Sequence, residues 1–180
     1  MDRVDQEHDY WNENAQDPEV DIKYISDRDV KLCKKDLGEL KGKVLEVGCG
    51  VGRLMEDGWY GIDISENMLE IAQKRNNTLK LFQSDGRLIP FDDDFFDNVY
   101  CYLVFQHLQP DAVEVYIDEI HRVLKKGGTF TFQFIQGTER EPYSNHYTLE
   151  EIKRLTTYFE SGKTFQSHAE KNWTIGRYTK

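Results

Sequence analysis

Three glycines stand at alternate positions directly after a short apolar segment, in the run Glu46-Val-Gly-Cys-Gly-Val-Gly52. Glycine permits left-handed backbone conformations and lets a ligand approach the main chain closely. The run lacks the Gly-Lys-Ser/Thr of a P-loop, and no glycine completes the GxGxxG pattern of a dinucleotide-binding loop. We therefore predict a buried strand over 44–47, followed by a glycine loop that presents a nucleoside-like ligand without phosphate-binding residues.

Short apolar segments alternate with amphipathic ones along the rest of the chain, which predicts strand–helix–strand units and a parallel sheet. The clearest helix follows Pro110, because its apolar residues recur at spacings of three and four and proline suits a first turn. Lys125-Lys126 and Gly127-Gly128 favour the end of that helix. The predicted strands are 44–47, 60–63, 79–83, 96–103 and 129–135. Two other helices are predicted at 22–40 and 65–75, and a third begins at the capping box Thr148-Leu-Glu-Glu151.

The C-terminal region offers two further strands, 163–170 and 173–180, close enough in sequence to form an antiparallel hairpin. The expected fold class is α/β, with a seven-stranded sheet that is mostly parallel and carries this hairpin at its edge. Only residues 48–58 connect the first two strands, fewer than a parallel crossover normally contains. We expect a shortened first crossover helix at 53–57, with helix 22–40 or another subunit covering the sheet there.

The charge of the chain limits the class of its partners. It has 23 basic and 33 acidic residues, and the resulting net charge of -10 disfavours nucleic acid and favours a cationic ligand. Residues 1–20 hold seven of the acids and one base, together with the aromatic pair Tyr10-Trp11. We expect residues 1–20 to form an N-terminal arm or lid and residues 21–180 to form a single domain, since 180 residues is an ordinary domain length.

The apolar content and the cysteines indicate the cellular compartment in which the protein is expected. The longest apolar run, Val99 to Phe105, is far shorter than a membrane-spanning helix, and the polar N-terminus does not resemble a signal peptide. We therefore expect no membrane association. Cys33, Cys49 and Cys101 are odd in number and widely spaced, which predicts neither a disulfide framework nor a cysteine metal site. These features together favour the cytoplasm.

Acidic residues follow two of the predicted strands. Asp63 ends the second strand, and Asp85 follows the third within Ser84-Asp-Gly86. Ligands of doubly wound sheets bind outside the carboxyl ends of the strands. A carboxylate at Asp63 could accept both hydroxyls of a ribose, and one at Asp85 could accept from an adenine amino group. The structural alternatives are that Asp63 caps the next helix and that Asp85 is a turn residue.

Four runs, VLEVGCGVGRL, GIDISENML, SDGRLIPFDDDFFDNV and HRVLKKGG, resemble those of the class I S-adenosylmethionine-dependent methyltransferases when taken in this order. The closest resemblance is to the small-molecule branch that includes the ubiquinone/menaquinone-biosynthesis type. It covers residues 43–135, and the run TLEEIKRL and the final strand pair extend it to the C-terminus. It implies a Rossmann-like doubly wound fold, S-adenosylmethionine as cofactor and S-adenosylhomocysteine as product, but not the acceptor.

The resemblance also implies roles for individual residues. Glu46 would lie near the cofactor ammonium, the glycine loop would cradle the methionine part, and Asp63 would take the ribose hydroxyls. Ile64 and Met68 would pack on the adenine, Asp85 would meet its amino group, and Cys101 and Leu103 would lie beneath the sulfonium. The full set of cofactor-binding candidates is Tyr10, Trp11, Glu46, Gly48, Cys49, Gly50, Gly52, Asp63, Ile64, Met68, Asp85, Gly86, Arg87, Cys101 and Leu103.

Two residues at or after the end of the fourth predicted strand are candidates for catalysis, His107 as a base and Tyr102. The alternatives are a structural histidine and a tyrosine that only forms the pocket wall. Asn145 and His146 would border the same opening as solvated loop residues. We expect no metal site, since the consecutive Asp92-Asp93-Asp94 point in different directions and form a solvated loop.

The function that the resemblance implies is methyl transfer to a small-molecule acceptor by in-line displacement, carried out by a single methyltransferase domain over 21–180. One alternative is methylation of a protein side chain or a carrier-bound substrate, because the large lid insertions of the family are absent. A second is a cofactor-binding but inactive fold that serves as a partner subunit. A homodimer would also be compatible with the sequence.

Overall fold

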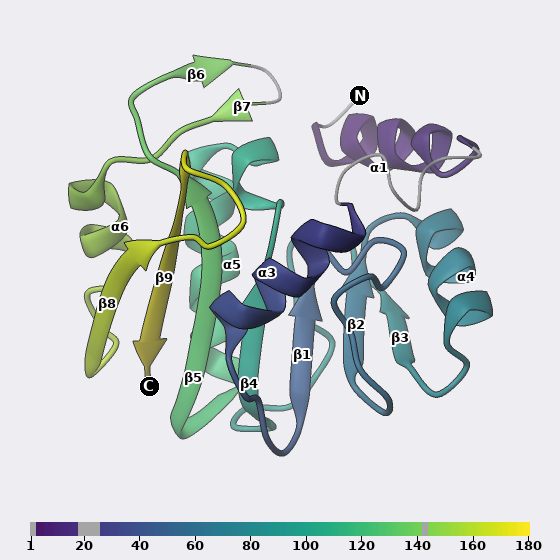
Figure 1. Ribbon diagram of the computed structural model, residues 1–180, viewed down its shortest axis with the longest axis horizontal. Helices are drawn as coiled ribbons and strands as arrows, with labels where there is room; N and C mark the ends of the chain where they lie inside the picture. Colours follow the sequence, from purple (N-terminus) through teal and green to yellow (C-terminus); the bar gives the residue numbers. More distant parts are fainter. Residues whose placement is uncertain (1–2, 18–25, 142–143) are drawn as a thin grey trace.

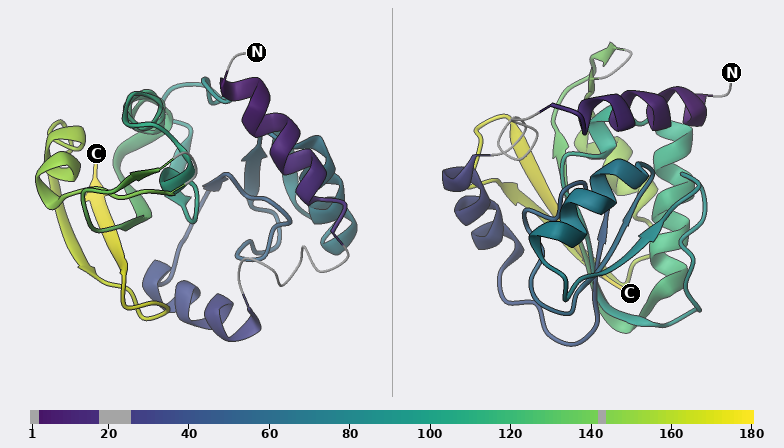
Figure 2. Two further views of the ribbon diagram at one scale, coloured as in Figure 1. Left: turned by 90° about the horizontal axis from the view of Figure 1, so that it is seen from above. Right: turned by 90° about the vertical axis from the view of Figure 1, so that its right-hand side faces the viewer.

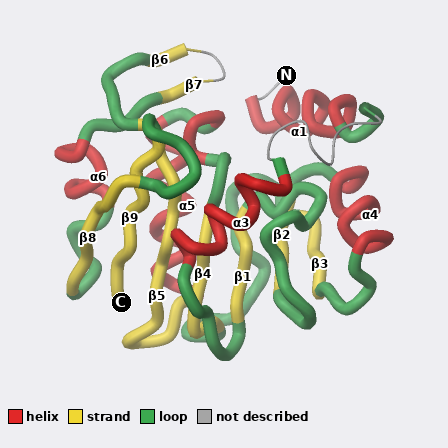
Figure 3. The backbone as a smooth tube through the Cα atoms, viewed as in Figure 1, coloured by secondary structure: helices red, strands yellow, loops and turns green. Residues whose placement is uncertain are grey.

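A computed structural model describes residues 3–17, 26–141 and 144–180 of the chain (Figure 3). Helices and short strands are interspersed along the described part of its first two thirds, although two pairs of consecutive strands there have no α-helix between them. The helices are α1 (Arg3–Asn14), α3 (Asp27–Leu37), α4 (Glu66–Arg75), α5 (Pro110–Val123) and α6 (Leu149–Leu155), with a short 3-10 helix at Phe105–His107. The strands are β1 (Val44–Val47), β2 (Tyr60–Asp63), β3 (Lys80–Gln83), β4 (Phe96–Cys101), β5 (Leu124–Ile135), β6 (Arg140–Glu141), β7 (Ser144–Asn145), β8 (Ser161–Gln166) and β9 (Trp173–Thr179).

Seven of these strands form one sheet in the order β3-β2-β1-β4-β5-β9-β8. The first five pair in parallel, and β9 pairs antiparallel with both β5 and β8. The predicted fold class, including the antiparallel C-terminal hairpin at one edge, is therefore confirmed. The strand order reverses at β1, between β2 and β4, so ligands are expected outside the carboxyl ends of these strands. Helix α1 lies across that end of the sheet (Figure 1).

The two faces of the sheet are covered by different helices (Figure 2). On one face, α5 and α6 pack against alternate residues of β5, where Phe130, Phe132 and Phe134 are fully buried as the sequence pattern predicts. The buried helical residues of this cluster include Val113, Tyr116, Ile117, Ile120, Val123, Ile152 and Leu155. Burial of these side chains supplies the main apolar contribution to the stability of the fold.

On the other face, α3 covers the centre of the sheet. Cys33 and Leu37 of α3 pack with Leu54 and with Tyr100 of β4 in one buried cluster. Residues 48–59 contain no helix at all, so the prediction of a short helix at 53–57 is wrong. The connection is a loop, and α3 supplies the layer that a first crossover helix would otherwise provide. The sheet face that suggested a partner subunit is thus covered from within the chain.

Several predicted boundaries differ from the structure. Helix α5 ends at Val123, and Lys125-Lys126 belong to β5, because Leu124 already pairs with Phe96 of β4. Strand β4 ends at Cys101 rather than at residue 103, since Leu103 takes a left-handed conformation (φ 59°) that turns the chain out of the sheet. Its N–H is held by the side-chain oxygen of Gln133 at 3.1 Å.

The helix predicted over 22–40 is shorter where the structure describes it. Ser26 caps its first turn in a capping box with Asp29, and Gly38 ends it with a left-handed backbone (φ 69°). The predicted start at 22–25 lies outside the described residues, as does the proposed boundary between the arm and the domain at residues 20 and 21.

The N-terminal segment, predicted as a polar arm or lid with no helix assigned to it, contains helix α1. The sequence of α1 has no strong apolar face of its own. The helix is held by docking, since the side-chain oxygen of Asn12 accepts from the Ser65 hydroxyl at 2.6 Å and Asn67 donates to the Asn12 carbonyl at 3.2 Å. Ala15 at its end packs on Val51 and Met68. Tertiary contacts therefore determine this helix.

Candidate functional site

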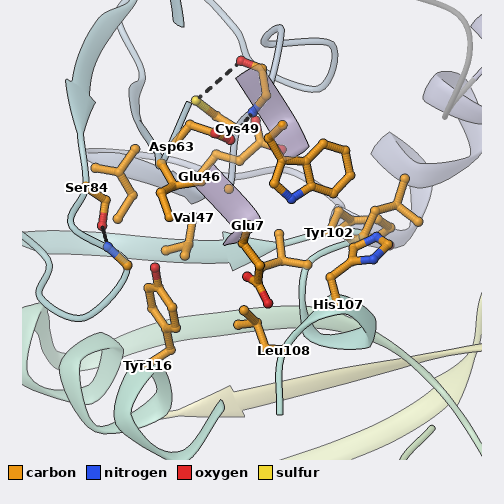
Figure 4. Close-up of a pocket in the computed structure, with 18 of the residues that line it drawn as sticks. Glu7, Glu46, Val47, Cys49, Asp63, Ser84, Tyr102, His107, Leu108 and Tyr116 are labelled. Atoms are coloured by element: carbon orange, nitrogen blue, oxygen red, sulfur yellow. Dashed lines mark hydrogen bonds between the residues drawn. The ribbon is translucent and has the colours of Figure 1, made fainter. Parts of the chain in front are cut away.

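A pocket of about 680 Å³ opens at the carboxyl ends of β1, β2 and β4 (Figure 4). This volume is typical of small-molecule sites. The pocket lies at the switch point in strand order, between the glycine loop, α1 and the segment after β4. The predicted residues in its lining are Trp11, Glu46, Gly48, Cys49, Gly50, Asp63, Ile64, Met68, Gly86, Arg87, Tyr102, Leu103 and His107.

The glycine loop is tied to the end of β2. The Gly48 and Cys49 N–H groups both donate to the Ile62 carbonyl, and the Gly50 N–H donates to Asp63 Oδ2 at 2.7 Å. Gly50 has a φ of 49°, and a Cβ built on it would meet no atom within 4 Å. The loop therefore follows a backbone path that favours glycine, and it leaves open space beside Gly50 on the pocket side.

The Asp63 carboxylate connects this loop to the next helix. Its Oδ1 accepts the Ser65 N–H at 2.9 Å while Oδ2 holds Gly50. The ligand-binding and capping interpretations of Asp63 are compatible, because each carboxylate oxygen can accept a second hydrogen bond. Burial raises the pKa of Asp63, although the backbone N–H groups of Ser65 and Gly50 partly oppose this shift.

Glu46 lies at the floor of the pocket, with only 4% of its surface exposed. The Tyr100 hydroxyl donates to Glu46 Oε2 at 2.9 Å. Loss of hydration raises the pKa of Glu46 well above its ordinary value, and the hydrogen bond from Tyr100 opposes this only in part. A cation bound here would reverse the shift, so the site is suited to a positively charged group.

The opposite wall of the pocket combines aromatic rings from α1 and from the segment after β4. The Trp11 and His107 rings meet edge to face with their centroids 5.2 Å apart. Tyr102 is 4% exposed, and its hydroxyl has no hydrogen-bond partner among the described residues. Burial raises the pKa of Tyr102, with the Asp36 carboxylate adding to the effect, so its phenol stays protonated.

Four predicted cofactor-binding residues lie outside the pocket lining. Tyr10 is 38% exposed on α1, and Cys101 is fully buried in the core that faces α5. Gly52 faces Leu79 and Ala72 instead of the cavity. Asp85 is exposed, and its Oδ1 accepts the Arg87 and Leu88 N–H groups, so it acts as the turn residue of the structural alternative.

Other lining residues were not anticipated from the sequence. Glu7 reaches the pocket from α1, and Tyr116 and Val115 reach it from α5. Glu7 and Trp11 are four residues apart, which puts them on one face of a helix. That spacing could have indicated Glu7, but only if a helix had been predicted there. The Ser84 hydroxyl, also in the lining, accepts the Gly86 N–H at 3.1 Å (Figure 4).

The residues expected to border the opening take other roles. Asn145 is fully buried and donates to the Leu108 carbonyl at 2.9 Å, so its prediction as a solvated residue is wrong. His146 pairs with Glu139 at 2.8 Å near the β6–β7 hairpin. Asp92, Asp93 and Asp94 are exposed as predicted, and Asp93 and Asp94 pair with Arg122 and Lys180.

Comparison with known sequences relates the central part of this chain to a known family. The sequence pattern of the family described as "Methyltransferase domain" matches residues 45–132. The demethylmenaquinone methyltransferase of Staphylococcus aureus is 35% identical over 116 residues, and this alignment covers 54% of the chain and 45% of that protein. The chain spans about half the length of the curated relatives that it matches.

Two solved structures share the fold over nearly the whole chain. Phosphoethanolamine N-methyltransferase 1 of Haemonchus contortus has a TM-score of 0.80 at 15% identity, covering 98% of this chain and 48% of that one. The DhpI-SAM-HEP complex has a TM-score of 0.79 at 16% identity, covering 98% and 97%. At these identities the structures show a common fold alone. With the methyltransferase domain matched over residues 45–132 and the seven-stranded topology, they give this chain the fold of the class I S-adenosylmethionine-dependent methyltransferases.

Proposed function

We propose that this chain transfers a methyl group from S-adenosylmethionine to a small-molecule acceptor. One observation carries the proposal: the glycine loop opens onto a pocket whose lining contains two carboxyl groups, Glu46 and Asp63, with pKa values raised by burial. Burying carboxylates at a cavity costs stability unless a bound cation or hydrogen-bond donor offsets that cost. S-adenosylmethionine carries an ammonium, a sulfonium and two ribose hydroxyls.

The residues present fit this cofactor. The open space beside Gly50 would admit the methionine part against the backbone, where any side chain would intrude. Glu46 would accept from the ammonium, and the remaining lone pairs of Asp63 would accept from the ribose hydroxyls. Ile64 and Met68 lie in the same lining and would pack on the adenine. For Asp85, Oδ1 already accepts two backbone N–H groups, and the adenine amino group would donate to Oδ2.

The chemistry divides between the cofactor and the chain. When bound, S-adenosylmethionine supplies a methyl group activated by the positive sulfur for in-line displacement. The task of the chain is to exclude water and hold the acceptor in line. Trp11 and His107 form the wall on the side of α1, and Leu103, in its left-handed conformation just after β4, also lines the pocket. His107 is the candidate base for an acceptor that must lose a proton.

A small acceptor is favoured over a macromolecular one because α1 lies across the carboxyl end of the sheet and contributes Glu7 and Trp11 to the lining (Figure 1).

The described residues contain no helix long and apolar enough to span a membrane. Cys33, Cys49 and Cys101 are free and buried. These thiols support a reducing compartment, and we place the activity in the cytoplasm on that basis.

Calorimetric titration with S-adenosylmethionine and S-adenosylhomocysteine tests this proposal. Asp63→Ala should weaken binding by about 1–3 kcal/mol, since donors of the ligand lose a charged acceptor. The matched control is Asp92→Ala, an exposed aspartate outside the pocket lining. The wild type and the control should bind alike. Failure of the wild type to bind either compound would contradict the proposal, and equal affinity of Asp63→Ala would contradict the ribose assignment.

A further inference from the structure

The part of the pocket beyond the glycine loop has a distinctive combination of groups. Glu7 and Trp11 project from one face of α1, and His107 and Tyr102 lie on the segment after β4. Figure 4 shows the Glu7 carboxylate among the lining side chains, above Leu108. Trp173, from the start of β9, adds a further aromatic ring to the lining. A pocket that contains both a carboxylate and several aromatic rings is suited to organic cations.

The charged groups that line the pocket also favour a cationic acceptor. Its lining contains four carboxylates and two guanidinium groups among the described residues, namely Glu7, Glu46, Asp63, Asp111, Arg53 and Arg87. Arg53 is already paired with Asp27 at 2.6 Å, and no lysine contributes to the lining. Glu46 and Asp63 are assigned to the cofactor, so the carboxylates left for the acceptor are Glu7 and Asp111, against Arg87. This remaining excess of negative charge would repel an anionic acceptor and attract a cationic one.

The Tyr102 ring forms part of the pocket wall, while its hydroxyl is buried beside the Asp36 carboxylate on the side of α3. The carboxylate that an acceptor nitrogen would meet on the side of α1 is therefore Glu7. Glu7 is held on this side of the pocket because Asn12, further along the same helix, accepts a hydrogen bond from Ser65 at the start of α4.

Building on the proposed function, we propose that the acceptor is a small amine, cationic in solution, and that Glu7 binds and orients its nitrogen. The nitrogen must lose a proton to expose its lone pair, and the Glu7 carboxylate receives that proton. The lone pair then forms the new N–C bond, while the C–S bond breaks and its electron pair stays on sulfur as a thioether. The methylated product leaves as an ammonium, and the proton on Glu7 passes to water.

A set of matched probes tests the acceptor class by binding. The probes are 2-phenylethylamine, 2-phenylethanol and phenylacetate, together with n-butylamine, n-butanol and butyrate. Each is titrated by calorimetry into the protein saturated with S-adenosylhomocysteine. We expect the amine of each series to bind at least tenfold more tightly than its alcohol or carboxylate. Tighter binding of the alcohols or carboxylates, or no binding by either amine, would overturn the amine assignment.

Substitution of Glu7 then tests the residue. In Glu7→Gln, amine affinity should fall at least tenfold and the pH dependence of methylation, scored by release of S-adenosylhomocysteine, should shift. The control is Glu13→Gln, an exposed glutamate on the same helix outside the pocket lining, which should behave as wild type. Unchanged amine affinity in Glu7→Gln would refute the role of Glu7. Affinity for S-adenosylhomocysteine, measured alone, shows separately whether the proposed function stands.

Discussion

Replacing Glu46 by glutamine should make the ligand-free protein more stable and the cofactor bind less tightly. Glutamine has nearly the same shape, and its amide oxygen can still accept from the Tyr100 hydroxyl that is 2.9 Å from Glu46 Oε2. The substitution therefore removes the ionisable group while keeping the packing. Because burial raises the pKa of Glu46, the folded state holds its proton at pH values where the unfolded chain has lost it.

The sign and size of the effect follow from proton linkage. A raised pKa stabilises the fold only while the carboxyl is protonated in both states, and that advantage is lost as the pH rises from about 4.5 through the pKa of the folded state. In that window the wild type should lose stability relative to Glu46→Gln by up to about 1.4 kcal/mol per pH unit. Above the folded-state pKa the difference should become constant.

Urea denaturation followed by circular dichroism between pH 5 and 8.5 measures this difference. Taking the difference between the two proteins cancels the contribution of titrating groups that do not interact with Glu46, such as His121. In parallel, affinity for S-adenosylmethionine should fall by about 1.5–3 kcal/mol in Glu46→Gln, since a charged hydrogen bond to the ammonium is lost. A stability difference that does not change with pH, or an unchanged affinity, would refute the reasoning.

Two further comparisons use matched pairs. Gly50→Val and Gly58→Val each place a side chain at positive φ, where its Cβ would have no atom within 4 Å, so both should lower the stability by about 1–2 kcal/mol. Only Gly50→Val should abolish cofactor binding in a calorimetric titration. Equal binding by the two variants would contradict the role of Gly50 in holding the cofactor. Trp11→Ala should weaken cofactor binding by about 0.5–1.5 kcal/mol through loss of its ring contacts, whereas Tyr10→Ala, on the exposed side of α1, should not. A larger effect of Tyr10→Ala in the same titration would mean that the wrong face of α1 had been assigned to the pocket.

The central part of the fold could be predicted from the sequence because local and tertiary preferences agree there. The apolar positions of α5 recur with helical spacing and all face one cluster, and Phe130, Phe132 and Phe134 alternate as a half-buried strand must. The capping box at Thr148 and Glu151 is present as predicted. The Gly-rich loop and Asp63 were recognisable because both follow strands that end at the same edge of the sheet.

Predictions failed where distant contacts decide the local conformation. Helix α1 is polar, and its stability depends on Asn12 reaching Ser65, which no local pattern reveals. Lys125 and Lys126 resemble a helix end, but the pairing of Leu124 with Phe96 draws them into β5. Asp85 looks equivalent to Asp63 in the sequence, yet a tight turn directs its carboxylate to its own backbone. Nothing in the sequence indicated the left-handed backbone of Leu103, whose N–H donates to the Gln133 side chain of the neighbouring strand β5.

The most direct test of the central claim, that this pocket binds the cofactor, is to map ligand-induced shifts in a ¹⁵N-labelled sample. S-adenosylhomocysteine is titrated in and amide and indole resonances are followed. We expect shifts at Gly48, Gly50 and Ile64 and at the Trp11 indole, while Gly127 and Gly162, which lie outside the lining, should not shift. Shifts confined to the surface around Gly137 and His146, or no shifts at saturating ligand, would contradict it.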